Sequence, residues 1–126
     1  MSTGILTNAQ PGSIGRAGAV TLSGRDIIVS GGGLVSSDTA GVGNGGTVQV
    51  TAQGPLTLSD RGSGIIASSS SAASGSAGSV AVSAPQIMLM SGAEISSTTA
   101  GAGAGGSVSV TTPGALILDG AGVANT

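Results

Sequence analysis

An ungapped internal repeat of 60 residues runs through most of the chain. The segment 17–58 aligns with the segment 77–118 without insertion or deletion, and nearly half of the aligned positions hold identical residues. A repeat at a fixed period is the sequence signature of an architecture built from stacked copies of one small unit. A silk-like or linker segment of low complexity does not keep an apolar register over such a length, so this alternative is disfavoured.

Each 60-residue unit divides again into two shorter units. The pattern small residue, Gly, any residue, Val, any residue, Val or Leu occurs at 17–22, 45–50, 77–82 and 105–110, with spacings of 28, 32 and 28 residues. We therefore predict one domain over residues 1–126. Its predicted parts are a partial coil 1–16 and the coils 17–44, 45–76, 77–104 and 105–126.

Aliphatic residues alternate with other residues inside each predicted coil. Alternation over three to five residues with a β-branched bias is typical of short strands, and the Gly, Pro, Asn and Ser between the runs are turn residues. The predicted core ladder consists of Val20, Leu22, Ile27, Val29, Val35, Val48, Val50, Leu56, Leu58, Ile66, Val80, Val82, Ile87, Leu89, Ile95, Val108, Val110, Leu116, Leu118 and Val123.

Three short strands cannot bury their apolar face alone, but stacked coils can. Parallel strands lie about 4.8 Å apart, so stacking places each Val of one coil over a Val or Leu of the next. Parallel crossover connections are right-handed. The predicted fold class is all-β, a right-handed parallel β-helix (β-solenoid) of about four coils, each with 28–32 residues and three short strands, arranged as a 60-residue double repeat.

The residue types that carry most enzyme chemistry are missing. The chain has no Phe, Trp, Tyr, Cys, His or Lys, and its charged residues are three Arg and five acids. The usual nucleophiles, bases and soft metal ligands are therefore absent, as are the cations and rings that bind nucleic acid. No apolar run is long enough to cross a membrane, and no signal-peptide pattern is present. We expect no enzyme activity, no cofactor or metal, no nucleic-acid partner and no membrane insertion.

Two glycine-rich loops, 41–46 and 101–106, match the pattern G-x-G-x-x-G. A dinucleotide site requires a helix after such a loop, whereas Val-x-Val follows here and predicts a strand. We interpret the loops as repeated corners where the chain packs closely or adopts a positive φ.

The five acids do not recur at one position of the repeat, so a stacked calcium site is disfavoured. Asp38 and Glu94 fall near the same predicted strand in alternate coils, about 10 Å apart by strand spacing. This is at the far edge of the carboxyl separation in inverting glycosidases, so glycan cleavage is a weak alternative. The hydroxyl-rich runs 36–39 and 96–99 raise an ice-binding alternative, but a polar outer face is favoured because Thr-x-Thr does not recur on every coil.

An apolar stripe is expected on the outside of one face. If Ile27 points inward, its neighbour Ile28 points outward, and the equivalent position of the next coil is Thr57. Exposed apolar stripes mark contact surfaces, although a loop covering the face is an equal alternative. The predicted lateral interface consists of Ile28, Met88, Met90 and Ile117.

The first and last coils carry the same aliphatic pattern as the middle of the chain and have no polar cap. Solenoids need polar caps, and open strand edges promote pairing with other strands. We therefore expect these coils to stack end to end with another copy or to continue in a longer solenoid.

The phrases GILTNAQPGSIGRAG (4–18), TAQGPLTLSDRGSGIIASSSSAASGSAGSV (51–80) and GSAGSVAVSAPQIMLMSGAEISSTTAGAGAGGSV (75–108) resemble the repeats of filamentous-haemagglutinin-like exoproteins. These are large bacterial proteins secreted by the two-partner route. The resemblance implies a right-handed β-helix, export to the cell surface or medium, and a part in adhesion, aggregation or biofilm. The secretion domain of that family is not recognisable in this sequence.

The expected function is that of a structural, non-catalytic β-solenoid segment of a secreted or cell-surface bacterial fibrous adhesin. A self-assembling extracellular filament subunit is the first alternative, and a glycan-binding or glycan-cleaving β-helix is the second. The expected partners are further copies of the chain, end to end or laterally, and a host or cell-surface glycan or protein.

Overall fold

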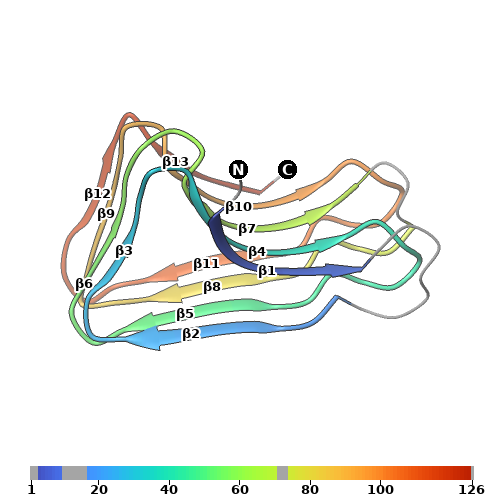
Figure 1. Cartoon of the computed structure of the whole chain (residues 1–126), viewed down its shortest axis with the longest axis horizontal. Helices are drawn as coiled ribbons and strands as arrows, with labels where there is room; N and C mark the ends of the chain where they lie inside the picture. Colours follow the sequence, from blue (N-terminus) through green and yellow to red (C-terminus); the bar gives the residue numbers. More distant parts are fainter. Residues whose placement is uncertain (1–2, 10–16, 71–73, 126) are drawn as a thin grey trace.

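The computed structural model describes residues 3–9, 17–70 and 74–125. Within these residues the chain forms thirteen β-strands and no helix, and hence no helix that could span a membrane. The strands fall into three parallel sheets, named A, B and C below. The sheets form the sides of a flattened, roughly triangular solenoid (Figure 1).

Consecutive strands belong to different sheets, and every third strand returns to the same sheet. Sheet A contains β1 (Thr3–Ala9), β4 (Gly33–Thr39), β7 (Gly64–Ser69), β10 (Glu94–Thr99) and β13 (Gly122–Asn125). Sheet B contains β2 (Val20–Gly24), β5 (Val48–Ala52), β8 (Val80–Ser83) and β11 (Val108–Thr111). Sheet C contains β3 (Ile27–Val29), β6 (Pro55–Leu58), β9 (Gln86–Met90) and β12 (Leu116–Asp119).

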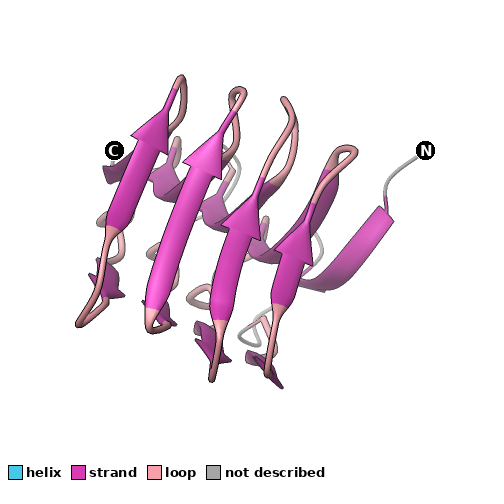
Figure 2. Ribbon diagram, turned by 90° about the vertical axis from the view of Figure 1, so that its left-hand side faces the viewer, coloured by secondary structure: helices cyan, strands magenta, loops and turns pink. Residues whose placement is uncertain are grey.

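The solenoid is right-handed and makes about three turns. In Figure 1 the chain runs leftward along β2, upward along β3 and rightward along β4, and Figure 2 places the N-terminal strands on the side nearest the viewer of Figure 1. The path is therefore clockwise and recedes from the viewer. The all-β solenoid predicted from the repeat is confirmed, but four coils is a slight overcount, because four strands stacked in sheets B and C are separated by three turns.

The interior is a set of aliphatic ladders, one for each inward-facing position of the strands. In sheet B, Val20, Val48, Val80 and Val108 are aligned in register, and in sheet C each strand contributes two aliphatic residues. The middle of the stack is the driest part, because each residue there has a coil on both sides. The large aliphatic side chains with the least exposure are Val48, Val50, Leu56, Leu58, Ile65, Ile87, Leu89 and Ile95.

The predicted inward position of Ile66 is wrong. Ile66 was expected in the ladder, but Ile65 occupies that position and is fully buried, aligned with Val35 and Ile95. Because successive residues of a strand point to opposite faces, Ile66 falls on the outer face of sheet A, where it is half-buried. The sequence Gly64-Ile65-Ile66 offers two adjacent aliphatic residues, and only the pairing with neighbouring strands selects the inner one.

Predicted core residues at the ends of the stack are only partly covered. Leu22, Val108 and Val110 are half-buried, although they pack against the core. Leu116, Leu118 and Val123 belong to the ladder by register, as predicted, but they have exposed fractions of 43%, 48% and 39% and so lie outside the buried core. Their positions in register are inward, but no described coil lies beyond them to exclude water.

The corner between sheets C and A requires a left-handed backbone in each coil. Positive φ values occur at Gly31, Asp60, Ser91 and Gly120. The Asp60 carboxylate accepts a hydrogen bond of 2.9 Å from the N–H of Gly31, which ties this corner to the one before it. An L-residue in this conformation is unfavourable, and at Asp60 and Ser91 hydrogen bonds to a neighbouring coil accompany it.

Candidate functional site

The C-terminal end of the solenoid is an open apolar surface. It consists of the inward positions of β11, β12 and β13, and it is called the C-terminal face below. Each of these strands has a neighbour on one edge only among the described residues, so its other edge presents backbone groups along the solenoid axis. The C-terminal face consists of Val108, Val110, Leu116, Leu118 and Val123.

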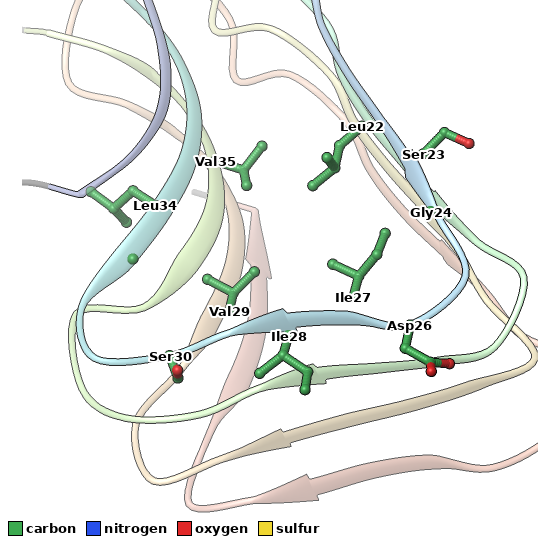
Figure 3. A pocket seen from close by; sticks show the side chains of 11 residues that line it. Leu22, Ser23, Gly24, Asp26, Ile27, Ile28, Val29, Ser30, Leu34 and Val35 are labelled. Carbon is green, nitrogen blue, oxygen red and sulfur yellow. The ribbon is translucent and has the colours of Figure 1, made fainter.

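The N-terminal end has a cavity of about 470 Å³ between β2, β3 and β4. Leu22, Ile27, Val29 and Val35 point into it from three sides, whereas Ile28 points to the outside of β3 (Figure 3). These four inward residues are called the N-terminal face below. They are the first members of the same ladders that end at the C-terminal face, so the two faces have the same pattern of aliphatic positions.

The outer stripe predicted on sheet C has the expected geometry. Ile28, Thr57, Met88 and Ile117 are aligned in register across β3, β6, β9 and β12. Ile28 is 71% exposed and Ile117 is 39% exposed, whereas Met88 is half-buried. Met90 lies on the same outer face, beside Asp119, and is also half-buried. Sheet C faces the viewer in Figure 2, and there its strands are not covered by another segment of the chain.

The glycine-rich loops are packing corners. A Cβ at Gly46 would overlap the carbonyl oxygen of Gly18, and a Cβ at Gly78 would overlap that of Gly46. Gly106 has the same relation to Gly78. None of these three glycines has a positive φ, so close approach between coils explains them, and their loops lead into strands as predicted. No helix N-terminus lies among the described residues to receive a dinucleotide phosphate.

Two buried serines connect these glycine corners to sheet A. The Ser37 hydroxyl donates to the carbonyl oxygen of Gly18 at 3.1 Å and accepts from the N–H of Gly46 at 3.1 Å. Two coils later, Ser97 donates to the carbonyl oxygen of Gly78 at 2.9 Å. Sequence reasoning grouped these serines with a polar outer face. Ser37 and Ser97 each lie two residues after an inward aliphatic residue, Val35 or Ile95, and this spacing is the signal that identifies them as inward-facing.

The acids of the described residues lie apart from one another along the solenoid. The described residues contain no cluster of three or more His, Cys, Asp or Glu side chains that could hold a metal ion. Glu94 is aligned with Leu34, at the start of its strand, whereas Asp38 lies four residues further along. Two strand spacings and four residues along the strand then separate the two acids by roughly 16 Å. The predicted separation of about 10 Å is therefore wrong, and the two acids lie further apart than the carboxyl pair of an inverting glycosidase.

The carboxylate of Asp38 has a structural use on the outer face of sheet A. It accepts hydrogen bonds from Ser36 at 3.3 Å and from Ser68 at 2.6 Å. Ser37 and Thr39 point inward instead, and Thr39 donates to the carbonyl oxygen of Gly43. The hydroxyls of this region are thus divided between two faces and engaged within the protein, which does not favour the flat array needed to order ice.

Comparison with protein-family models, curated proteins and solved structures gives no significant match. The resemblance to filamentous-haemagglutinin-like repeats therefore stays a prediction. Among the described residues, the exposed apolar surfaces are the C-terminal face and the outer stripe of sheet C, whereas Ile27, Val29 and Val35 of the N-terminal face are buried.

Proposed function

We propose that the chain is a structural, non-catalytic segment of a β-solenoid rod, in a secreted or cell-surface fibrous adhesin of bacterial type. The observation that carries the proposal is the continuation of one set of aliphatic ladders from the N-terminal face to the C-terminal face. A stack that repeats the same aliphatic positions in every coil suits a rod. The sequence resemblance to exported bacterial adhesins supports the adhesin and its location.

The mechanism of such a rod is geometric. Each coil adds about 4.8 Å to the length of the solenoid, and backbone hydrogen bonds between coils run along its axis. Examples are the bonds from Val20 N–H to Thr47 and from Val48 N–H to Ser79, both 2.8 Å long. The interior packing and these bonds hold the coils in a fixed register. The outer faces then present side chains at regular spacing, so a partner meets many weak, equivalent contacts rather than one pocket.

The outer stripe is the part of the rod surface that best suits lateral contact with a second solenoid. Its residues repeat at the strand spacing, so the stripe of another copy has the same spacing and the same apolar character. Burial of Ile28 and Ile117 would supply the favourable term, because these are the most exposed aliphatic residues of the stripe.

Multivalent presentation tests the adhesin proposal. Beads coated with the purified chain are expected to attach to bacterial or epithelial cell layers more strongly than beads coated with an unrelated protein of equal net charge. The same protein should release no reducing ends from polysaccharides. Absence of attachment with every glycan and cell surface would contradict the adhesin, and release of reducing ends would contradict the non-catalytic assignment.

A self-assembling filament subunit is the second candidate, and the exposed aliphatic residues of the outer stripe and the C-terminal face favour it. Electron microscopy of the purified chain distinguishes the two candidates. Long fibres from this chain alone support the filament, whereas short particles that still attach to cells support the adhesin segment.

A further inference from the structure

The corner between β4 and β5, at the right of Figure 1, contains an asparagine that is bonded in two directions. The backbone carbonyl oxygen of Asn44 accepts a hydrogen bond of 3.2 Å from the N–H of Ala17. Its side-chain Oδ1 accepts a second bond, of 2.9 Å, from the N–H of Ser76 in the next coil. Asn44 therefore links its own corner to the equivalent corners of the coils before and after it.

The residue that follows Asn44 is bonded to the same partner. The N–H of Gly45 donates to the carbonyl oxygen of Ser76 at 2.8 Å. Ser76 thus holds the Asn44 side chain through its N–H and the Gly45 backbone through its carbonyl group. The same backbone bond recurs one coil later, from Ala77 to Ala104. There Ser76 stands at the position of Asn44 and has no amide side chain to add the second bond.

The dipeptide Asn-Gly is prone to a spontaneous reaction of its own backbone. The nitrogen of the glycine attacks Cγ of the asparagine, a C–N bond forms, ammonia leaves and a cyclic succinimide results. Water then opens the ring at either carbonyl, which gives aspartate or isoaspartate. Glycine favours the attack because it has no side chain to obstruct its nitrogen. Of the three asparagines in the chain, only Asn44 is followed by glycine.

Packing explains why residue 45 is glycine. A Cβ at this position would lie 2.6 Å from the backbone nitrogen of Gly78 in the next coil, so no larger residue fits. Close stacking therefore places the reactive dipeptide at this corner. The same stacking restrains it, because backbone of the next coil lies against Gly45 and the N–H of Gly45 is bonded to Ser76.

We propose that the Asn44–Gly45 peptide is a self-modification site, protected in the stacked solenoid and reactive when the junction with the next coil opens. Ring closure requires the Gly45 nitrogen to lose its proton and the Asn44 side chain to turn toward it. Both movements break the bonds to Ser76. The reaction therefore proceeds from the opened junction, and its rate follows the population of that state. The inference is independent of the function proposed above.

The two products differ in whether the coil can close again. Aspartate at position 44 keeps an oxygen that accepts from the N–H of Ser76. Isoaspartate carries the main chain through Cβ and so adds one bond to the backbone of a corner where Gly46 already lies against the backbone of Gly18. A coil that has formed isoaspartate at this position does not close in the same register, so its opening becomes irreversible.

Peptide mapping of the unaltered chain measures the reaction. Cleavage after Arg25 and Arg61 releases the segment 26–61, in which Asn44 is the sole asparagine. The purified chain is incubated at mildly alkaline pH, either folded in buffer or unfolded in urea, and mass spectrometry gives the deamidated fraction over time. We expect deamidation of Asn44 to be at least about tenfold slower in the folded chain, because two hydrogen bonds must break first.

A variant that loosens the junction tests the link between opening and reaction. Val48 is fully buried in β5, and its N–H is bonded to Ser79 in the next coil. Val48→Ala should speed deamidation of Asn44 in buffer, because it raises the opened population, and leave the rate in urea unchanged. The matched control is Asn44→Gln, which keeps a side-chain amide but would have to form a larger ring, so it should stay unmodified in both states.

Refolding tests the irreversible step. Chains that carry isoaspartate after incubation in urea are isolated by chromatography and returned to buffer, and they should not regain the circular dichroism spectrum and unfolding midpoint of the parent. Asn44→Asp, which has the other product, should regain both. Equal deamidation rates in the folded and unfolded chain would refute protection by the junction. Complete refolding of the isoaspartate form would refute irreversible opening.

Discussion

Gly78 lies directly against Gly46 in the preceding coil, so closely that a Cβ on Gly78 would overlap the carbonyl oxygen of Gly46. The atoms that such a Cβ would meet are all backbone atoms of Gly45 and Gly46, so no flexible side chain could move away to make room. Both glycines are also part of the pattern that reveals the repeat. The residue that marks each coil in the sequence is therefore the residue that permits coils to approach.

The first prediction concerns this contact. Gly78→Ala should lower the free energy of unfolding by about 3 kcal/mol or more, because the added methyl overpacks a site that is closed by main chain. Gly122→Ala is the matched control, since no atom lies within 4 Å of a Cβ at that position. Urea unfolding of the two variants measures the difference. Equal stabilities would show that the coils are further apart than described.

The second prediction compares two leucines at one ladder position. Leu89 and Leu118 are paired in register, but Leu89 is fully buried and Leu118 is 48% exposed. Leu89→Ala should cost about 2–5 kcal/mol of stability, as for a buried leucine, and Leu118→Ala about 1 kcal/mol or less. Thermal and urea unfolding provide the measurement. A large loss for Leu118→Ala in the single chain would mean that another segment covers the C-terminal face.

The third prediction addresses adjacent isoleucines. Ile65→Thr should be strongly destabilising, by about 2 kcal/mol or more, because it places an unpaired hydroxyl in an aliphatic ladder. Ile66→Thr should cost about 1 kcal/mol or less, since this residue is half-buried on the outer face between Ser36 and Ser96. Chemical denaturation of both variants decides the order. The reverse order would shift the register of β7 by one residue.

The fourth prediction concerns the outer stripe. The double variant Met88→Asp/Ile117→Asp should weaken lateral association while the far-UV circular dichroism spectrum and unfolding midpoint stay close to those of the parent chain. Thr57→Asp alone is the control, because it adds a charge to the same face without removing an apolar contact. Sedimentation velocity over a range of concentrations gives the result. Unchanged association of the double variant would exclude the stripe as an interface.

The sequence was sufficient to predict the architecture because the repeat and the alternation act at the level of whole coils. Val20, Val48, Val80 and Val108 are aligned in the solenoid as their shared pattern predicts. The pattern was insufficient at Ile66, where two aliphatic neighbours make the phase of the strand ambiguous. Pairing with strands about 30 residues away resolves that ambiguity, and a local sequence pattern contains no information about this pairing.

The surfaces were predictable to a smaller extent. The outward position of Ile28 follows from alternation, but the exposure of Leu118 depends on whether another coil lies above it. The hydrogen bonds of Ser37 were not predicted, because they join a strand to a corner in the next coil. Asp38 and Glu94 were placed too close together, since the sequence does not fix where along its strand each acid lies.

The hydrogen bonds between coils point along the axis, and this gives the solenoid an unusual response to a pull on its ends. Force applied along the axis loads these bonds in tension, one coil after another, rather than all strands at once in shear. A detached coil of about 30 residues contributes about 4.8 Å to the folded stack but roughly 100 Å of extended chain. The protein would therefore extend in discrete steps, one coil at a time. Each step would dissipate mechanical energy before the contacts on the outer faces of the solenoid had to break.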